Sequence, residues 1–535
     1  DWDEMFKRMG TFKDVEREEM EHFEEHLATV EAAKKKESTD VTMDVEPTNE
    51  SVAELTNRDA EWRKALRASM KPKERTAIER VKMPELDPVY RATTRTEEVN
   101  IGLTKEMALT EAKRCLDCPK PSCMEGCPVN INIPSFVKNI ERGQFLAAAK
   151  VLKNTSALPA VCGRVCPQEK QCESRCVHLK MNKPAVAIGY LERFAADYER
   201  QSGNISIPEK DPANGIKVAV VGSGPAGLSF AGDMAKKGFD VTVFEALHEI
   251  GGVLKYGIPE FRLPNAIVDV EIENLEKMGV RFVADCIVGK TIGVKELEKQ
   301  GFKGIFVASG AGLPNFMNIP GENALNIMSS NEYLTRVNLM DAANPHTDTP
   351  INLGKNVVVV GGGNTAMDSC RTAKRLGANV TLVYRRSEAE MPARLEEVKH
   401  AKEEGITFLT LHNPKEYEAD EKGAVKSVIL DVMQLGEPDA SGRRRPEATG
   451  ETIKLECDQV IVAVGVSPNP LVPQSIEGLE LGRKNAIAVN EQMQSSQPAI
   501  YAGGDIVRGG ATVILAMGDG RKAALNMAQQ LKPEA

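Results

Sequence analysis

The sequence predicts an α/β protein in which a mostly helical domain precedes two doubly wound domains. Residues 217–245 and 355–386 each follow the order strand, glycine loop, helix, strand, which is how a parallel doubly wound sheet begins. Further short apolar strands lie at 304–310, 459–465 and 499–505. Eight of the 11 cysteines come before these segments, in two tight runs within a region of helical periodicity.

The N-terminal part reads as helix followed by linker. Residues 1–36 are strongly charged with a thin apolar stripe, so we expect one or two helices that form either a solvated tail or a docking element. Residues 37–58 are polar and predict a linker, and a short amphipathic helix surrounds Trp62. The predicted parts are a charged helical segment (1–40), a linker with a short helix (41–82), the cysteine domain (83–205), the first doubly wound domain (206–351 and 463–535) and the second, inserted into it (352–462).

Three helical stretches surround the cysteines. Residues 104–115 predict a helix with Thr104 as its N-cap, leading directly into the first cysteine run. Residues 131–156 predict two helices interrupted near Gly143, and residues 185–200 predict another after the second run. The cysteines are therefore expected on a helical scaffold.

Composition excludes several classes of protein. The 535 residues suffice for about three to four domains. A net charge of −9 gives no general basic surface, so neither nucleic acid nor an anionic membrane is an expected partner. No apolar stretch approaches the roughly 20 residues of a membrane helix, and there is no secretory signal. We therefore expect a cytoplasmic, reducing location in which the cysteines bind metal instead of forming disulfides.

The two cysteine runs predict metal clusters. They supply Cys115, Cys118, Cys123 and Cys127, then Cys162, Cys166, Cys172 and Cys176. Only Cys115 and Cys118 form the C-x2-C pair that structural zinc prefers, so the spacing favours 4Fe-4S clusters over zinc. By count, eight thiolates would fill two such clusters. The isolated Cys286, Cys370 and Cys457 are expected to be ordinary buried residues.

The first glycine loop, GSGPAG, predicts a dinucleotide site of the Rossmann type. Gly222 permits the tight turn, Gly224 the approach of a pyrophosphate, and Gly227 close packing of helix on strand. Glu245, at the end of the second strand, is suited to the ribose hydroxyls. The loop residues predicted to bind the cofactor are Gly222, Ser223, Gly224, Pro225, Ala226 and Gly227.

The second loop, GGGNTA, lacks the acidic partner. Its second strand ends in Arg385 and Arg386, and paired guanidinium groups suit a 2′-phosphate. This loop is therefore predicted to bind NADP(H), which leaves FAD for the first loop. The loop residues concerned are Gly361, Gly363, Asn364, Thr365 and Ala366. Near the C-terminus, Gly504 and Asp505 are a candidate contact for the flavin ribityl chain, although a turn aspartate is the ordinary interpretation.

These residues together resemble a known family. From about residue 80 onward the chain is similar to the glutamate synthase small-subunit family, which includes the N-terminal half of dihydropyrimidine dehydrogenase and the large subunit of NADH-dependent ferredoxin:NADP oxidoreductase (Nfn). The resemblance rests on both cysteine runs, GSGPAG with Glu245, YGIPEFRLP, GGGNTAMD, VYRRSEAEMPAR and YAGGD. The similarity to the Nfn large subunit is the strongest, because MPELDPVYRATTRTEEVNIGLT resembles the start of that subunit. The segment 1–19 resembles the tail of the Nfn small subunit, so a fused small-plus-large chain is expected.

The resemblance implies that each cluster takes ligands from both runs. One cluster would be held by Cys115, Cys118, Cys123 and Cys176. The other would be held by Cys127, Cys166, Cys172 and Glu192. Cys162 would then be a spare thiol, in conflict with the eight-cysteine count, and a solvent-facing Glu192 is the competing interpretation. The family pattern also indicates Gly252, Val253 and Arg262 as cofactor contacts; Asn265 stands where relatives often have lysine.

The expected function is electron transfer between NADP(H), FAD and two 4Fe-4S clusters, to or from a partner subunit. An Nfn-type partner would carry FAD and a 2Fe-2S centre, with ferredoxin as a further partner and electron bifurcation as a further activity. The alternative is a glutamate synthase small subunit that feeds a glutamate-forming large subunit. A zinc-bound scaffold with degenerate nucleotide folds is the non-enzymatic alternative. No side-chain acid or base catalyst is expected, since the cofactors carry the chemistry.

Overall fold

The computed structural model describes residues 48–439, 442 and 444–532. The helices predicted within residues 1–36 lie outside this range. The chain forms two compact units. Among the described residues, the large unit comprises 48–84, 100–314 and 465–532, and the small unit comprises 85–99 and 315–464 with its gaps. Each is described by itself.

The N-terminal half of the large unit is helical, as the sequence predicts. Thr104 caps α7 by accepting a hydrogen bond from the backbone amide of Met107, and Gly143, with φ of 79°, separates α9 from α10. The helices are α3 (Val52–Thr56), α4 (Glu61–Ser69), α5 (Pro72–Ala77), α7 (Lys105–Lys113), α8 (Ser122–Glu125), α9 (Ile133–Glu141), α10 (Phe145–Lys153), α11 (Pro159–Val165) and α12 (Ile188–Ser202), with 3-10 turns at η1 (Gln168–Lys170), η2 (Glu173–Arg175) and η3 (Val177–Met181).

A helix, α3, lies in the described part of the predicted linker, residues 48–58. Ser51 and Glu54 form a capping box that starts α3, and Leu55 on this helix is fully buried. It packs near α9 and α10. A single buried leucine in a polar stretch leaves too little periodicity for the sequence to reveal the helix.

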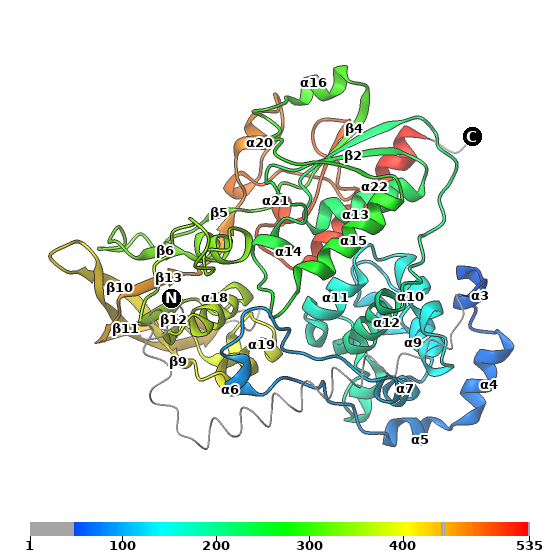
Figure 1. Cartoon of the computed structure of the whole chain (residues 1–535), viewed down its shortest axis with the longest axis horizontal. Helices are drawn as coiled ribbons and strands as arrows, with labels where there is room; N and C mark the ends of the chain where they lie inside the picture. The colour runs from blue at the N-terminus through cyan, green and yellow to red at the C-terminus, as the bar shows by residue number, and fades with distance from the viewer. Residues whose placement is uncertain (1–47, 440–441, 443, 533–535) are drawn as a thin grey trace. The chain divides into compact units, whose positions relative to one another are not determined.

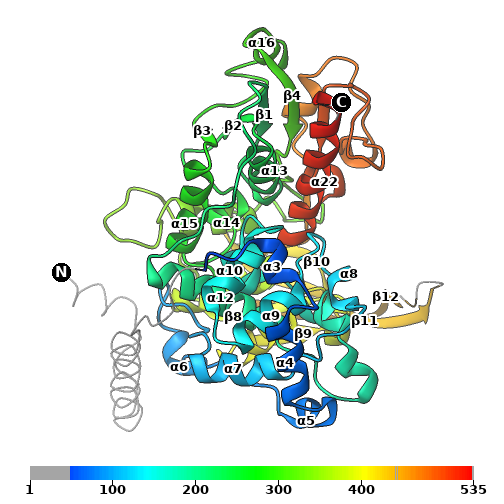
Figure 2. The same ribbon diagram turned by 90° about the vertical axis from the view of Figure 1, so that its right-hand side faces the viewer.

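A parallel five-stranded sheet forms the second half of the large unit. Its strand order is β15-β4-β1-β2-β3. Figures 1 and 2 show α13 (Pro225–Lys236) and α22 (Val513–Leu531) side by side against this sheet. A Cβ atom on Gly520 of α22 would lie 2.2 Å from the carbonyl oxygen of Ala226 on α13, so glycine allows the two helices to meet closely. The strands are β1 (Lys217–Val221), β2 (Asp240–Phe244), β3 (Arg281–Val283), β4 (Phe302–Val307) and β15 (Ile500–Ala502).

Shorter elements complete this half of the large unit. The antiparallel pair β5–β14 joins the residues just before and just after the inserted small unit. These elements are α14 (Val253–Tyr256), α15 (Asn265–Lys277), α16 (Val294–Lys299), β5 (Leu313–Pro314), β14 (Val466–Ser467), α20 (Leu471–Gln474), η6 (Arg483–Asn485) and α21 (Asp505–Arg508).

The small unit repeats the parallel sheet and adds an antiparallel one. The parallel order is β6-β13-β7-β8-β9, and β10-β11-β12 form the second sheet. The elements are α6 (Pro88–Arg91), β6 (Ile327–Ser329), α17 (Ser330–Leu334), the π-helix η4 (Thr335–Leu339), β7 (Asn356–Val360), α18 (Asn364–Arg375), β8 (Asn379–Tyr384), η5 (Glu388–Glu390), α19 (Leu395–Glu403), β9 (Thr407–Thr410), β10 (His412–Ala419), β11 (Val425–Pro438), β12 (Arg444–Glu456) and β13 (Gln459–Val462).

Two segments join the small unit that the sequence assigns elsewhere. Strand β6 adds residues before 352 to the parallel sheet, and 85–99 packs here instead of with the cysteine domain. Residues 85–99 pack in the small unit because Arg91 forms a buried ion pair with Glu404, with an N–O distance of 3.1 Å. The α/β class with two doubly wound sheets is confirmed. Within the described ranges, no helix is both long and apolar enough to cross a membrane.

Candidate functional site

The first glycine loop connects β1 to α13 along a path that requires glycine. Gly222 has φ of 102°, and a Cβ atom on it would lie 2.5 Å from the carbonyl oxygen of Ala308. A Cβ on Gly227 would lie 2.0 Å from the carbonyl oxygen of Gly222. Gly224, the N-cap of α13, has open space within 4 Å of its Cβ position. The loop therefore leaves room for a phosphate at the helix N-terminus.

Glu245 holds this loop from the end of β2. Its Oε2 atom accepts hydrogen bonds from the Ser223 backbone amide (2.9 Å) and hydroxyl (2.6 Å), and Oε1 accepts from the Leu247 amide (3.0 Å). The Ser223 hydroxyl also accepts from the Gly251 amide at 2.9 Å. A Cβ on Gly252 would lie 2.9 Å from Cα of Gly224. The buried carboxylate thus fixes the shape of the loop in addition to its predicted ribose contact.

The C-terminal candidate, Asp505, begins α21 directly after Gly504. Its Oδ1 atom accepts a hydrogen bond from the Ala511 amide at 3.1 Å, and burial, reinforced by the charge of Asp519, raises the pKa of Asp505 to about 6. Asp519, which the sequence analysis missed, accepts from the Gly504 amide (3.0 Å) and from Arg508 (2.6 and 2.7 Å). This network shapes the turn that carries Asp505.

The remaining predicted contacts of this loop lie on neighbouring elements of the large unit. Pro225 and Ala226 open α13, and Val253 opens α14. Arg262 is buried in the segment that precedes α15.

The second glycine loop repeats the first in the small unit. Gly361 has φ of 143°, and its Cβ would lie 2.3 Å from the carbonyl oxygen of Ala463. Gly363 is the N-cap of α18, and a Cβ atom on it would lie 4.0 Å from Cγ of Pro392. Thr365 is exposed and Ala366 is buried in the first turn of α18. In both loops, therefore, the first glycine is crowded and the glycine that caps the helix faces open space.

The segment 391–394 closes over the second loop. The Ala393 amide donates to the carbonyl oxygen of Gly362 (3.2 Å), and the Arg394 amide donates to Oδ1 of Asn364 (2.9 Å). The ring of Tyr384 lies against Gly362, since a Cβ there would be 2.6 Å from ring carbons. Tyr384 and this segment both lie within VYRRSEAEMPAR, but no local pattern in that stretch indicates their contacts with the loop.

Arg385 and Arg386 follow β8 in different environments. Arg385 is exposed, whereas Arg386 is 9% exposed. The Nε atom of Arg386 is buried and has no hydrogen-bond partner among the described residues. A buried guanidinium nitrogen without a partner is costly, so an anion at this position would stabilise it.

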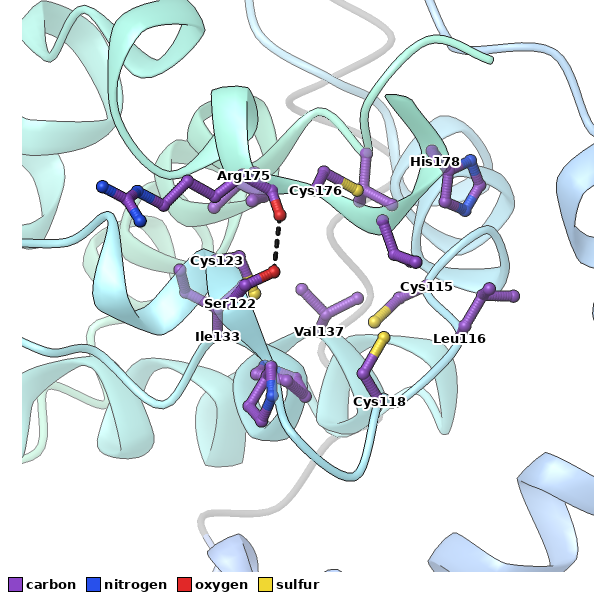
Figure 3. A pocket seen from close by; sticks show the side chains of 15 residues that line it. Cys115, Leu116, Cys118, Ser122, Cys123, Ile133, Val137, Arg175, Cys176 and His178 are labelled. Carbon is purple, nitrogen blue, oxygen red and sulfur yellow. Dashed lines mark hydrogen bonds between the residues drawn. The ribbon is translucent and has the colours of Figure 1, made fainter. Parts of the chain in front are cut away.

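Four cysteines from the two runs line one pocket of the large unit. They are Cys115, Cys118, Cys123 and Cys176. Figure 3 shows the thiols of Cys115 and Cys118 pointing toward each other, with Cys123 and Cys176 on other sides of the same pocket. The Ser122 hydroxyl donates to the carbonyl oxygen of Arg175 at 2.7 Å and so joins the two runs. This is the crosswise grouping that the resemblance implies.

The second predicted ligand set gathers around Glu192. Glu192 is buried, and burial, with a smaller contribution from the nearby carboxylate of Glu192, raises the pKa of both Cys127 and Cys172. A Cβ on Gly163 of α11 would lie 2.5 Å from the Arg193 amide nitrogen on α12, so these helices touch beside Glu192. Cys166 caps the C-terminus of α11. The solvent-facing interpretation of Glu192 is therefore wrong, while its role as a ligand stays a prediction.

Cys162 lies on α11, and its side chain also contacts α22. Its Sγ atom is 3.4 Å from Sδ of Met517 on α22, and its side chain is fully buried. The hydrogen bond with Cys166 and burial raise the pKa of Cys162, and the carboxylate of Glu192 adds to this shift. Both Cys162 and Glu192 thus remain available to the second set.

The protonation chemistry of these groups fits a bound cation. Burial raises the pKa of Cys115 to about 11 and that of Cys127 to about 12. Burial, with the charge of Glu271, raises the pKa of Glu192 to about 8, and its Oε1 atom has no hydrogen-bond partner among the described residues. Raised pKa values keep buried thiols and carboxyls protonated near neutral pH, and a bound cation favours their ionised forms. The residues present therefore fit metal clusters.

Cys286, Cys370 and Cys457 are buried apart from both sets, as predicted. Charged residues that the sequence pattern did not reveal lie next to the first set. Lys138 is fully buried and donates to the carbonyl oxygen of Cys115 at 2.6 Å. Only the folded helix α9 brings this lysine to the loop, so no local motif could have revealed it.

Two protein families match this chain. Residues 216–520 match the family described as pyridine nucleotide-disulphide oxidoreductase. Residues 91–204 match the family described as dihydropyrimidine dehydrogenase domain II, 4Fe-4S cluster.

Individual relatives cover most of the chain. The glutamate synthase [NADPH] small chain of Azospirillum brasilense is 34% identical over 452 residues, which cover 83% of this chain and 93% of the relative. The corresponding small chain of Escherichia coli K12 is 36% identical, and the match covers 80% of this chain and 92% of the relative. The beta subunit of the NADP(+)-dependent formate dehydrogenase of Moorella thermoacetica is 37% identical, and the match covers 77% of this chain and 60% of the relative.

Among solved structures, FprA of Mycobacterium tuberculosis superimposes with a TM-score of 0.51 at 20% identity. The match covers 59% of this chain and 85% of FprA. At this identity the likeness concerns the fold alone.

Proposed function

Because the chain belongs to the glutamate synthase small-chain family of pyridine nucleotide-disulphide oxidoreductases, we propose that it is the NADP(H)-, FAD- and iron–sulfur-binding subunit of an electron-transfer complex. The chain is an oxidoreductase by membership of this family. The observation that carries the proposal is the pocket in which one cysteine of the second run joins three of the first (Figure 3).

The first glycine loop is the proposed FAD site. Gly224 leaves open space at the N-terminus of α13, and Glu245 is positioned at the end of β2. Bound FAD supplies hydride and single-electron chemistry, and the clusters supply single-electron transfer. The chain's residues would bind and orient these groups.

The second loop is the proposed NADP(H) site. The exposed Arg385 and the buried Arg386 offer two guanidinium groups at the end of β8, where the first loop has a carboxylate. The open side of Gly363 suits the pyrophosphate at the N-terminus of α18. These features support NADP(H) over NAD(H).

The two ligand sets are proposed to hold two 4Fe-4S clusters. Cys115, Cys118, Cys123 and Cys176 form the first set; Cys127, Cys166, Cys172 and Glu192 form the second. The second set lies next to the flavin half of the large unit, because Met517 of α22 contacts Cys162, and a Cβ on Gly518 would lie 2.9 Å from Pro128. This adjacency supports electron transfer between a flavin at α13 and α22 and the second set.

We further propose an Nfn-like assembly, with a partner subunit carrying FAD and a 2Fe-2S centre, and with ferredoxin and bifurcation. The similarity of 83–104 to the Nfn lead-in supports it. A second candidate is a glutamate synthase small subunit, supported by relatives with that name that the chain covers almost entirely.

One purification distinguishes these proposals. The native complex is isolated, its subunits are identified, and its visible spectrum and iron content are recorded. Flavin bands with a broad iron–sulfur shoulder and about eight irons per chain support the enzyme with two 4Fe-4S clusters. A flavin and 2Fe-2S partner supports the Nfn-like assembly, and an amidotransferase partner supports glutamate synthase. Colourless protein that contains zinc would refute the proposed function.

A further inference from the structure

The N-terminal strap, which we define as residues 48–84 with α3, α4 and α5, lies before both matched families begin. It nevertheless packs on the cysteine domain of the large unit, where Figures 1 and 2 show it in blue. Leu55 is fully buried, and the guanidinium of Arg142 on the domain stacks 4.0 Å from the ring centroid of Trp62. The strap is therefore an integral layer over this domain.

Three arginines of the strap converge on one residue of the first cysteine run. Arg63 binds both carboxylate oxygens of Asp117 (2.6 and 3.0 Å), and Arg67 binds Oδ2 at 2.7 Å. Arg58 donates from two nitrogens to the backbone carbonyl of Asp117 (3.0 and 3.2 Å). Asp117 stands between Cys115 and Cys118, two predicted ligands of the first set.

The backbone conformation and the burial of Asp117 are both unfavourable without the contacts that the strap provides. Its φ of 51° lies in the left-handed region, which costs a non-glycine residue free energy. Its side chain is fully buried, so its carboxylate requires the paired guanidinium of Arg63, which is also buried. Because the backbone at Asp117 sets the direction of both neighbouring thiols, the strap fixes the geometry of two ligands.

The strap also brings positive charge to the first set. Arg58, Arg63 and Arg67 carry three charges against the single carboxylate of Asp117, which leaves an excess of two over these four residues. A 4Fe-4S cluster gains one negative charge when it takes up one electron, so nearby cations favour the reduced form. Hydrogen bonding and charge around the ligands are the protein's means of setting a cluster potential.

We propose that the N-terminal strap positions the ligand loop of the first set and raises the reduction potential of the cluster held there. This rests on the proposed function, which places a cluster on Cys115, Cys118, Cys123 and Cys176. Electrons that arrive from NADPH through the flavin are thereby directed toward this cluster. Arg58, Arg63 and Arg67 are positioning residues, since they act through Asp117.

The test uses the full chain with clusters, in Arg58→Gln and Arg63→Gln variants. Iron content is measured first, and each cluster is then titrated by EPR-monitored redox potentiometry. A Cys118→Ser variant identifies the signal of the first set. Lys64→Gln is the control: it removes a cation from α4, the helix that carries Arg63, and the ion-pair partner of Lys64 within the described part of the chain is Glu61, at 3.0 Å on the exposed side.

We expect Arg58→Gln to keep its iron and to lower the midpoint potential of the first-set signal, while the other signal and the Lys64→Gln control stay at wild-type values. Arg63→Lys is expected to restore most of the potential lost in Arg63→Gln, because it keeps the charge. An unchanged potential in iron-replete Arg58→Gln would overturn the proposal. Loss of iron in both Arg58→Gln and Arg58→Lys would overturn the proposed effect on the potential and leave the strap only its role in positioning the ligand loop. Wild-type protein without 4Fe-4S signals would instead refute the proposed function.

Discussion

The two glycine loops share a backbone design and differ in charge. In both, a crowded glycine follows a buried strand and an open glycine caps the next helix: Gly222 and Gly224 in the large unit, Gly361 and Gly363 in the small unit. The second strand then ends in buried Glu245 in one and in Arg385 and Arg386 in the other. We propose that the shared backbone lets both loops bind a pyrophosphate and that the difference in charge decides which nucleotide each loop prefers.

The largest effect is expected from crowding the first loop. In Gly227→Ala, the new Cβ would lie 2.0 Å from the backbone oxygen of Gly222, which cannot move as a flexible side chain would. Such overpacking costs about 1–3 kcal/mol or more. We expect purified protein to lose most of its flavin absorbance. Gly363→Ala in the second loop is the control, since its new Cβ would lie 4.0 Å from Cγ of Pro392. This variant should keep its full FAD content. Equal flavin content in both variants would break the comparison.

The next effect concerns the carboxylate of the first loop. Glu245→Gln removes the charge that accepts two hydrogen bonds from Ser223. Hydrogen bonds to charged groups contribute about 1.5–3 kcal/mol. The FAD dissociation constant, measured by flavin fluorescence, should therefore rise about 10- to 100-fold. NADPH affinity, measured on FAD-replete protein, should stay unchanged; a loss of NADPH binding instead would reverse our assignment of the loops.

The arginines of the second loop give a smaller and more selective effect. Arg386→Ala should raise the NADPH KM about tenfold, because it removes a charge-assisted contact to the 2′-phosphate. Arg385→Ala, at an exposed position, should have a smaller effect, and the NADH KM should not change in either. Arg445→Ala removes an exposed cation from β12 and serves as the control. If the double variant Arg385→Ala/Arg386→Ala leaves the NADPH KM at the wild-type value, the NADP(H) assignment fails.

The smallest expected effect is a pH dependence of the stability of the folded state, which arises from Glu85 in the small unit. Burial opposes ionisation of Glu85, but His400 (3.3 Å) and Lys399 (3.1 Å) outweigh it and lower the pKa of Glu85 from 4.5 to about 2. The ionised form therefore stabilises the folded state above pH 4.5, and this stabilisation is lost as the pH falls toward 2.

Glu85→Gln should consequently lower Tm by a few degrees, about 2–4 °C per kcal/mol, at pH 6, and the difference should shrink as the pH approaches 3. Thermal unfolding of both proteins across this range measures it. A constant difference at all pH values would show that the charge of Glu85 is not responsible.

Local patterns in the sequence were enough to predict the fold class and family. Strand, glycine loop and helix are contiguous, so β1 to α13 and β7 to α18 follow from neighbouring residues. The family resemblance is confirmed by relatives at 34–36% identity over most of the chain. Thr104 as an N-cap and the break at Gly143 are equally local and are also confirmed.

Long-range contacts account for what the sequence could not reveal. Glu85–Val99 joins the small unit because Arg91 pairs with residues some 300 positions away. Glu192, beside charged Arg193, gives no sign of burial in the sequence; it is buried because α11 meets α12 at Gly163. The strap's arginines likewise reach Asp117 only in the folded chain.

The comparison of the two loops is tested most directly by anaerobic titration of the FAD-replete wild-type protein with NADPH and with NADH, following loss of flavin absorbance. The account predicts that NADPH reduces the flavin at a concentration at least about tenfold lower than NADH does, since Arg385 and Arg386 add a charge-assisted contact only to the 2′-phosphate. Equal concentrations for the two nucleotides, or a preference for NADH, would contradict it.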